Sequence, residues 1–518
     1  FELSAAFQRT FASVHSIDAK AVFTVAENTG HNFWASRRDY LSTTVDQLFA
    51  GSSTTMQNAG NSEEGGRMGL VGRLKYDFAN RYYIEGSFRY DGSDNFAPGH
   101  RWGFFPSVAL GWDITEEPFF KNLTPRNIDL LKLRGSYGQM GTETGVNRFG
   151  YLSTYNMVEN AICIGGQLVS GFNEGGLTSP ELLSWYTRNS LNYGIDVAFF
   201  NYRLKGSADY FFYVTKGGLV SPEDRYTTPL GTKLPQIKSN NEHRREGFEL
   251  SMRWNDNIGS DFHYEIGTNM TYYNNLYVVK QEEALSTLMN PYKRSTHQTD
   301  YYKVILIDNG LYQSPEQILG VPRRLASSET KLGDIVYQDL NGDGKIDAED
   351  QIRYGMPTAP HFTYGVDFVF SYKGFSLSGL LYGTGKRNME FGVNTKKDES
   401  VHVKNEYQLD YWREDNRDAL FPRKSLSSGV NGGNNQVESS FWVKNASFLR
   451  LKNLSLSYDF KYKLLKNANW LSMCRVNLTG SNLFTISGVS DYFDPETTST
   501  NGGYPVQRVY SVGVTVGF

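Results

Sequence analysis

The chain has almost no cysteine, little proline and no long apolar run. Its two cysteines, Cys163 and Cys474, cannot build a disulfide framework, and one distant pair leaves the redox compartment open. No apolar stretch approaches the ~18 residues that a membrane helix needs. The formal net charge is −3, so the basic surface of a nucleic-acid-binding protein is missing and no nucleic-acid partner is expected.

Recognisable catalytic motifs are missing too. The eight histidines are scattered, and none has the HExxH spacing of a metalloprotease. The stretch YGTGKRN fails as a phosphate loop, because Leu380 and Arg387 stand where a glycine and a serine or threonine are required. Asp196, Asp209 and Asp367 fall on polar faces of predicted strands, where solvated charge is the ordinary state. We expect neither an enzyme nor an organic cofactor.

What the chain does have is glycine and aromatic residues in alternating patterns. It contains 51 Gly, 34 Tyr and 33 Phe, and in 362–372 aromatic or aliphatic residues alternate with Thr, Gly, Asp and Ser. Such alternation predicts strands with one apolar and one polar face. About fifteen strands are predicted, near 1–9, 16–31, 64–77, 81–92, 100–114, 129–140, 183–199, 201–215, 241–255, 261–280, 361–373, 375–388, 440–458, 473–487 and 505–518.

The connections between these strands alternate in length. Short turns such as 77–81 and 372–375 interleave with long loops, and that segregation is typical of outer-membrane barrels. The predicted fold class is therefore all-β, a transmembrane antiparallel β-barrel whose apolar strand faces contact outer-membrane lipid. The long loops, expected on the extracellular side, lie near 32–62, 141–180, 215–238, 282–360, 389–438 and 488–504.

Two finer features follow from the same pattern. In FLRLKNLSLSYDF, Leu451 is out of phase with Leu454, which predicts a bulge or an exit from the membrane near Asn453. Tryptophans are expected to form the aromatic girdles at the two membrane interfaces. They are Trp112, Trp254 and Trp470 at the periplasmic rim, and Trp102 and Trp442 at the outer rim.

Several stretches together resemble one family. They are YDGSDNFAPGHRWGFFPSVALGW, LKLRGSYGQMG, GDIVYQDLNGDGKIDAEDQIRYGMPTAPHFTYGVDFVFSYKGFSLS, FLRLKNLSLSYDF, GSNLFTIS and GGYPVQRVYSVGVTVGF. In this order they are similar to SusC/RagA-type TonB-dependent transporters of the Bacteroidota outer membrane. The resemblance implies a 22-stranded barrel filled by a plug domain. Residues 1–518 are then expected to supply its C-terminal part, without the plug and the first strands.

The resemblance also implies a function and partners. Active import of an oligosaccharide is the leading hypothesis, with an oligopeptide as the alternative substrate. The implied partners are a SusD-like surface lipoprotein that acts as a lid, TonB acting through the missing N-terminal part, that N-terminal remainder itself, and a dimer of such two-protein units. A passive porin and a soluble glycan-binding β-protein are the alternatives from other classes.

Residues 339–350, DLNGDGKIDAED, match the spacing of a calcium-binding EF-hand loop. Strand-like runs flank the loop where an EF-hand has helices, so a calcium sensor is excluded. We expect a structural Ca²⁺ or Mg²⁺ site in an extracellular loop, against the alternative of a metal-free turn. Its predicted ligands are Asp339, Asn341, Asp343, the Lys345 carbonyl, Asp347 and Asp350.

Aromatic residues beside polar ones in the long loops are candidate substrate contacts. Flat rings stack on the apolar faces of sugars while neighbouring polar groups bind the hydroxyls. The candidates are Trp34, Trp185, Tyr411 and Trp412. Each could equally pack in the core of a loop.

Overall fold

The computed structural model is almost entirely β-structure, joined by short helices. It describes residues 1–42, 44–123, 127–179, 181, 183–220, 234–235, 237–280, 284–324, 330–390, 409–424, 430–489, 493–497 and 506–518. These residues form two compact units, which we describe separately. Unit 1 comprises Phe1–Trp112, Arg134–Leu191 and Tyr213–Glu242; unit 2 comprises Asp113–Leu133, Asn192–Phe212 and His243–Phe518.

Each of the fifteen predicted strands is found in the structure. The described long strands that correspond to them are β1 (Glu2–Phe11), β2 (His15–Ser36), β3 (Gln57–Phe78), β4 (Tyr82–Ser93), β5 (Trp102–Asp113), β6 (Ile128–Thr142), β9 (Tyr186–Phe199), β10 (Leu204–Lys216), β13 (Glu242–Ile258), β14 (Phe262–Val279), β20 (Phe362–Tyr372), β21 (Phe375–Gly385), β24 (Phe448–Asp459), β25 (Met473–Ser481) and β27 (Val509–Gly517). No helix in the described parts of the chain has the length and hydropathy to cross a bilayer.

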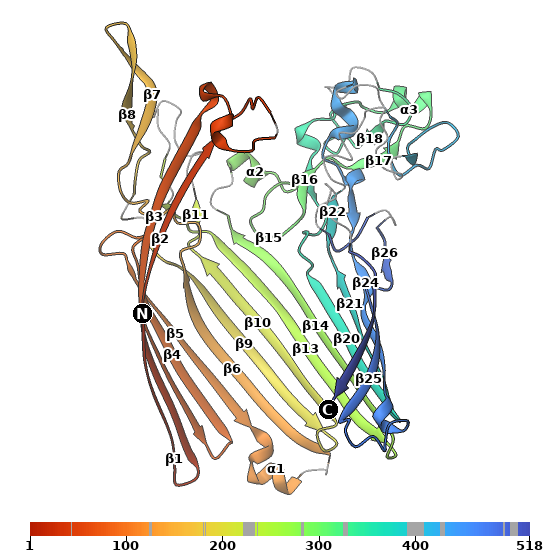
Figure 1. The fold of residues 1–518 in the computed structure, drawn as a ribbon. Helices are drawn as coiled ribbons and strands as arrows, with labels where there is room; N and C mark the ends of the chain where they lie inside the picture. The colour runs from red at the N-terminus through yellow and green to blue at the C-terminus, as the bar shows by residue number, and fades with distance from the viewer. Residues whose placement is uncertain are drawn as a thin grey trace. The chain divides into compact units, whose positions relative to one another are not determined.

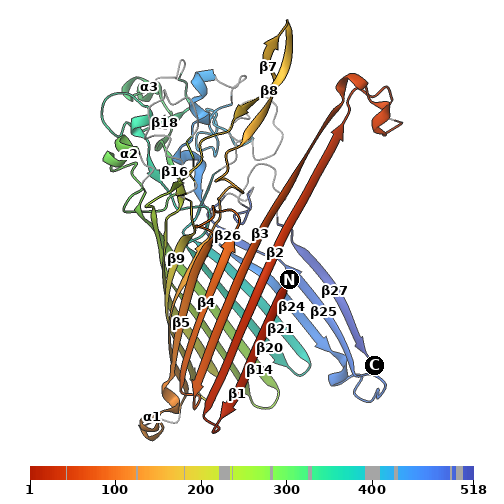
Figure 2. The same cartoon turned by 90° about the vertical axis from the view of Figure 1, so that its left-hand side faces the viewer.

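In unit 1, β1 to β5 pair antiparallel in sequence order. β2 and β3 have 22 residues each, whereas β4 and β5 have 12, so the β2–β3 ribbon continues beyond its neighbours (Figures 1 and 2). The predicted loop 32–62 is therefore too long. Its first and last residues are strand, and the connection itself is residues 37–56.

In unit 2, neighbouring strands again pair antiparallel, in the order β14, β20, β21, β24, β25 and β27 (Figure 2). Abundant glycine lets aromatic rings lie across the sheet. Gly379 pairs with Phe368, and a Cβ on Gly379 would be 2.4 Å from the Phe368 ring. The pairing of Gly383 with Tyr364 is similar, with 2.3 Å to the ring.

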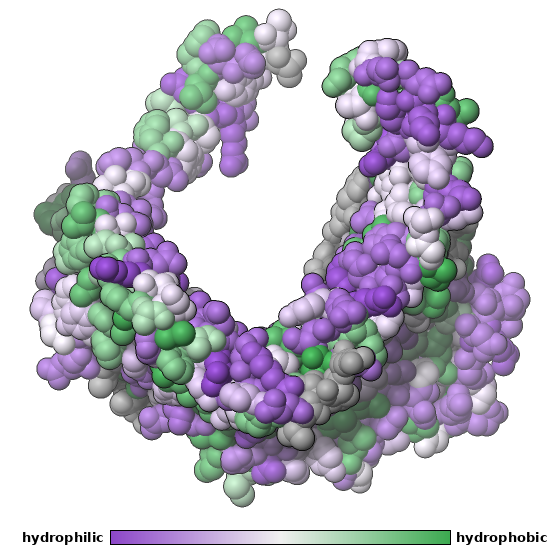
Figure 3. All heavy atoms as spheres, turned by 90° about the horizontal axis from the view of Figure 1, so that it is seen from below, coloured by the Kyte–Doolittle hydropathy of each residue, from purple (hydrophilic) through white to green (hydrophobic). Residues whose placement is uncertain are grey.

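Short turns join neighbouring strands within each unit. β20 and β21 are joined by Lys373 and Gly374, whose φ values of 46° and 86° are those of a tight hairpin turn. Residues 79–81 join β3 to β4, and Ala79 and Asn80 have φ values of 56° and 53°. Figure 3 shows the molecule from below the view of Figure 1, where hydrophobic residues (green) lie beside hydrophilic ones (purple).

The apolar face of the strands is exposed. On β27, Val512 and Val514 are 72% and 65% exposed, and on β5 Phe104 is 55% exposed. The cross-strand partner of Val512 is Leu478 on β25, which is also exposed, so the apolar stripe continues from strand to strand. Side chains that are apolar, aligned and unburied need an apolar surrounding, because contact with water is unfavourable.

The predicted irregularity in β24 is a bulge at Lys452. Leu380 pairs with Asn453 and Leu381 pairs with Leu451, so Lys452 has no cross-strand partner on β21. An extra residue shifts the alternation by one position. Arg450 therefore shares the polar face with Tyr382, and Leu451 returns to the apolar face.

The connections between the long strands contain small elements. In unit 1 these are η1 (Leu48–Ala50), η2 (Ser53–Thr55), the hairpin β7 (Tyr155–Ile164) and β8 (Gln167–Glu174), β11 (Leu219–Val220) and β12 (Ile237–Lys238). In unit 2 they are η3 (Ile114–Glu116), α1 (Pro118–Leu123), α2 (Leu285–Met289), β15 (Gln298–Thr299), β16 (Lys303–Ile305), β17 (Asp308–Leu311), α3 (Pro315–Gly320), β18 (Ile335–Tyr337), η7 (Ala348–Asp350), β19 (Ile352–Tyr354), β22 (Asn388–Glu390), η9 (Val430–Gln436), η10 (Ser440–Trp442), β23 (Val443–Asn445), η11 (Phe460–Tyr462) and β26 (Thr485–Ser487). Parts of the predicted loops 215–238, 389–438 and 488–504 lie outside the described residues.

One expected girdle residue is placed differently. Trp102 and Trp470 are 47% and 67% exposed, as an interfacial ring requires, and Trp470 stacks on Phe518 with ring centroids 5.9 Å apart. Trp442, in contrast, is 1% exposed and packs against Phe421 and Phe441. The girdle prediction for Trp442 is wrong, because strand alternation does not extend into this loop.

The exposed stripe generates the first prediction. Val514→Arg is expected to lower the free energy of unfolding by about 2–4 kcal/mol, the cost of a cation facing the middle of the bilayer. Urea unfolding in lipid vesicles measures this difference. The control Thr515→Arg places the same charge on the opposite face of β27 and should change the free energy of unfolding far less. Equal costs at the two positions would refute the assignment of the faces.

Candidate functional site

The polar faces of the strands carry ion pairs. In unit 2, Arg253 on β13 contacts Glu265 on β14 and Asp367 on β20, with 3.1 Å between Nη2 and the Asp367 Oδ2. In unit 1, Arg73 on β3 pairs with Asp18 on β2 at 2.9 Å. Each of these carboxylates is paired with an arginine on another strand of the sheet, as on a hydrated charged surface.

The long loops of unit 2 fold around a hydrophobic core of their own, which we call the outer-loop core. It lies at the end of β20, β21 and β24 that is opposite the short turns (Figures 1 and 2). Segments from three parts of the sequence meet in it. Its buried members are Leu306, Leu311, Ile335, Tyr337, Ile346, Trp412, Phe421, Phe441 and Trp442.

A buried ion pair fixes the outer-loop core. Asp334 is completely buried, and Arg423 donates to its two oxygens from Nε at 2.6 Å and from Nη2 at 3.3 Å. Asn435 donates to the same carboxylate at 2.9 Å and accepts the Ile335 amide at 3.0 Å. Such a pair is stable only where further hydrogen bonds satisfy the remaining sites, as they do here.

A buried tyrosine completes this network. The Tyr337 hydroxyl donates to the Asn434 carbonyl oxygen at 2.5 Å. Burial raises the pKa of Tyr337 far above its usual range, so the hydroxyl keeps its proton. Asn434 and Tyr337 are 97 positions apart, so nothing in the local sequence pattern indicates the contact.

The predicted cation loop, residues 339–350, forms a tight turn held by its own carboxylates. The buried Asp350 accepts the amides of Leu340 and Asn341 on Oδ1 at 2.9 and 3.4 Å, and that of Asp347 on Oδ2 at 2.9 Å. Asp339 accepts the amides of Gly342 and Gly344. A carboxylate has about four acceptor sites, so Asp350 has little capacity left and Asp339 has more.

The remaining predicted ligands of this loop are more open. Asn341 and Asp343 are exposed and each accepts one backbone amide, while Asp347 caps the following turn. Lys345 is exposed at the predicted carbonyl position. Within the described residues, no group of three or more His, Cys, Asp or Glu side chains converges as metal ligands do. The cation site stays a prediction.

The four candidate substrate contacts are divided between the units. In unit 1, Trp34 is 47% exposed near the end of β2, whereas Trp185 is 8% exposed and packs against Phe96 and Phe105. The Trp185 indole donates to the Arg101 carbonyl oxygen at 2.9 Å. Trp185 therefore presents no free ring face in this structure, as the loop-core alternative expects.

In unit 2, the other two candidates adjoin the outer-loop core. Trp412 is 8% exposed and its indole donates to Gln313 at 3.0 Å, so it is a member of the core. Tyr411 is half-buried at the edge of the core, beneath the Arg413 guanidinium at 5.3 Å. Trp34 and Tyr411 thus remain predicted ligand contacts.

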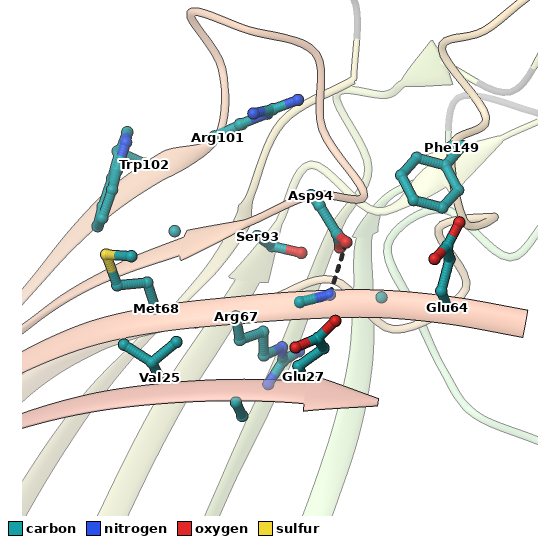
Figure 4. Close-up of a pocket in the computed structure, with 14 residues that line it drawn as sticks. Val25, Glu27, Glu64, Arg67, Met68, Ser93, Asp94, Arg101, Trp102 and Phe149 are labelled. Carbon is teal, nitrogen blue, oxygen red and sulfur yellow. Dashed lines mark hydrogen bonds between the residues drawn. The ribbon is translucent and has the colours of Figure 1, made fainter. Parts of the chain in front are cut away.

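A cavity of about 470 Å³ opens in unit 1 between β2, β3 and the β4–β5 connection (Figure 4). Asp94 points to the Gly66 amide and accepts it at 2.5 Å. Val25, Met68 and Trp102 follow one another across the paired strands on the exposed apolar face. The cavity is also lined by charged side chains, so it lies where the apolar face of the strands meets a charged surface; these are Glu27, Glu64, Arg67, Asp94 and Arg101.

The strands have one exposed apolar face and one charged face, and comparison with known proteins leads to the same kind of fold. Residues 5–483 match the family described as TonB dependent receptor-like, beta-barrel. The chain belongs to this family. Its fold is thus the antiparallel β-barrel fold of TonB-dependent receptors, and it is an outer-membrane protein of a Gram-negative bacterium. The exposed apolar stripe faces lipid.

Individual relatives support this assignment. TonB-dependent receptor SusC of Bacteroides thetaiotaomicron is 28% identical over 86% of this chain and 43% of its own length. TonB-dependent receptor P3 of Formosa agariphila is 25% identical over 99% of this chain and 51% of its own length. The chain spans about half the length of these curated relatives.

Two solved structures share the fold. They are states of the RagAB peptide importer. The 'open-open' state gives a TM-score of 0.79 with 21% identity, covering 100% of this chain and 54% of that one. The 'closed-closed' state gives 0.77 with 21% identity, covering 99% and 55%. At this identity the likeness establishes the fold and leaves the substrate open.

The outer-loop core generates the second prediction. Asp334→Ala leaves the largely buried Arg423 guanidinium, 16% exposed, without its carboxylate and should destabilise the core by about 3–5 kcal/mol. Hydrogen exchange of the Ile335–Tyr337 amides reports this loss locally. The control Asp415→Ala removes an exposed partner of Arg413 and should cost less than about 1 kcal/mol. Unchanged exchange in Asp334→Ala would contradict the role of the pair.

Proposed function

We propose that this chain forms part of an outer-membrane transporter that imports oligosaccharides with energy from TonB. One observation carries the proposal: the strands are apolar on the side that faces lipid and charged on the other side. The chain that shows it belongs to the TonB-dependent receptor family. The similarity to SusC over most of the chain favours this transport class over a passive porin.

The proposed partners follow from the same class. The N-terminal remainder of the transporter would supply the plug on which TonB acts, and a SusD-like lipoprotein would cover the outer loops. The outer-loop core supports the second partner, because a packed core with a buried ion pair gives a lid a firm surface to dock on. Two such transporter–lid units would associate as a dimer.

An oligopeptide is the second candidate substrate. It is favoured by the likeness to RagAB, which is described as a peptide importer. Trp34 and Tyr411, the candidate contacts that keep a partly exposed ring, could stack on a sugar or on a peptide side chain.

Growth of a deletion strain tests the proposed function. A strain that lacks the gene should lose growth on at least one glycan as sole carbon source and keep growth on peptides. Complementation in a strain without TonB should fail to restore growth, whereas a passive porin would restore it. Unimpaired growth on every glycan, with a defect on peptides, would replace the sugar by the peptide.

We also propose that the 339–350 loop binds a structural divalent cation. Asp339, Asn341, Asp343 and the Lys345 carbonyl are the ligands with free acceptor capacity, and Ca²⁺ prefers such oxygen ligands. Asp350 would contribute mainly by holding the turn through the backbone amides it accepts. A bound cation would tie the loop that leads into the outer-loop core, since the neighbouring Ile346 is a core member.

Isothermal titration with calcium chloride tests this site. The purified protein should release heat above the buffer blank, and Asp343→Ala should abolish it, because the variant removes an exposed oxygen ligand. Glu349→Ala is the matched control, an exposed carboxylate in the same loop outside the ligand set. A titration indistinguishable from the blank would mean a metal-free turn.

A further inference from the structure

Arg387 is a buried cation with an unused hydrogen-bonding edge. It lies between β21 and β22, next to the first residue of β22, and is 5% exposed. Among the buried side-chain atoms in the described residues, its Nε and Nη2 both lack a hydrogen-bond partner. A buried donor without a hydrogen bond lowers the stability of the folded protein, and the cost is larger when the donor is charged. An acceptor that binds this edge would remove the cost.

The two unpartnered atoms are the pair that binds a carboxylate side-on. Nε–H and Nη2–H point in parallel from one edge of the planar guanidinium, and their spacing matches the two oxygens of a carboxylate. This chain uses the same edge elsewhere. Arg423 binds Asp334 through Nε and Nη2, and Arg89 binds Asp91 through Nε at 3.0 Å and Nη2 at 3.2 Å.

The neighbouring basic residues are already satisfied. Arg450 donates from Nη1 to Glu496 at 2.5 Å, from Nη2 to Asp494 at 2.8 Å and from Nε to Thr485 at 2.8 Å. Lys452 donates to both Glu496 oxygens at 2.6 and 2.7 Å. Asp494 and Glu496 thus pair with Arg450 and Lys452, and no ion pair of Arg387 is found in the part of the chain that the structure describes.

The surroundings of Arg387 belong to the polar side of the sheet. Tyr382 pairs with Arg450 across β21 and β24, and Thr384 pairs with Phe448 on the same face. Tyr382 and Glu496 are near enough to interact electrostatically with Arg387. Thr384 is 3% exposed, and within the described residues its hydroxyl also has no partner. A second unused polar group therefore lies on this face.

We propose that Arg387 is a subsite for a carboxylate group of the transported solute, bound side-on by Nε and Nη2. This inference rests on the proposed import function and narrows its substrate to molecules that carry a carboxylate. A single positive charge matches a carboxylate monoanion better than a phosphate group, whose charge near neutral pH is closer to −2. The carboxylate can come from a peptide or from an acidic sugar.

Ligand-dependent thermal stability of the purified protein in detergent tests the subsite without transport. Sodium acetate, compared with sodium chloride at equal ionic strength, should raise the melting temperature of the wild type. N-acetylglycine and glucuronate, each compared with its neutral counterpart N-acetylglycinamide or glucose, identify a peptide-like or a sugar-acid source. At least one of these two acids should stabilise the protein more than its neutral counterpart.

Three variants distinguish acetate binding at Arg387 from a nonspecific effect of acetate on thermal stability. Arg387→Gln should bind acetate at least about tenfold more weakly, the loss expected for a charge-assisted hydrogen bond. Arg387→Lys keeps the charge without the side-on edge and should fall between Arg387→Gln and wild type. Arg89→Gln removes a guanidinium whose edge is already occupied by Asp91 and should respond like wild type. A heat-modifiable gel shift checks that each variant is folded.

The outcomes are distinct. An equal acetate response in wild type and Arg387→Gln would overturn the subsite. A specific acetate response without stabilisation by either N-acetylglycine or glucuronate would overturn the solute assignment and leave a site for small ions. Either failure leaves the import function standing, because growth of the deletion strain measures that function independently.

Discussion

The hydrocarbon core of a membrane offers no hydrogen-bond partner to a backbone, and this constraint governs the structure. Each strand must pair with its neighbours, and its lipid-facing side chains must be apolar. The paired strands β14, β20, β21, β24, β25 and β27 meet both requirements, with exposed valines on β27 beside exposed leucine on β25. Glycines opposite aromatic rings, such as Gly379 opposite Phe368, let large side chains lie flat on this surface.

The opposite face obeys a different rule, because it carries charges that must be solvated or paired. The bulge at Lys452 shows how one extra residue decides which side chains lie on the apolar face and which on the charged face. By shifting the alternation, it directs Arg450 to the polar face and Leu451 to the apolar one. Arg450 then holds Asp494 and Glu496, so a single inserted residue positions a segment more than forty positions away. The charge of Arg387 lies beside this cluster.

Beyond the strands, the chain packs as a water-soluble protein does. The outer-loop core buries Trp442 and Phe421 and satisfies the buried Asp334 with Arg423 and Asn435. In this region apolar residues point inward, whereas on the strands they point outward. Trp185 and Trp412 illustrate the consequence, because each of them is buried in a loop core. Tyr411 lies at the edge of the outer-loop core, and Trp34, near the end of strand β2, stays 47% exposed.

The sequence by itself determined the strands, their apolar faces, the short turns and the bulge, because these depend on alternation over neighbouring residues. It also determined the family, through motifs in a fixed order. It did not determine which loop aromatics are buried, or that Trp442 leaves the girdle, or that Asp334 meets Arg423. Those outcomes, like the unpartnered edge of Arg387, depend on contacts between segments far apart in the chain. Only tertiary packing decides them, since local periodicity carries no information about distant partners.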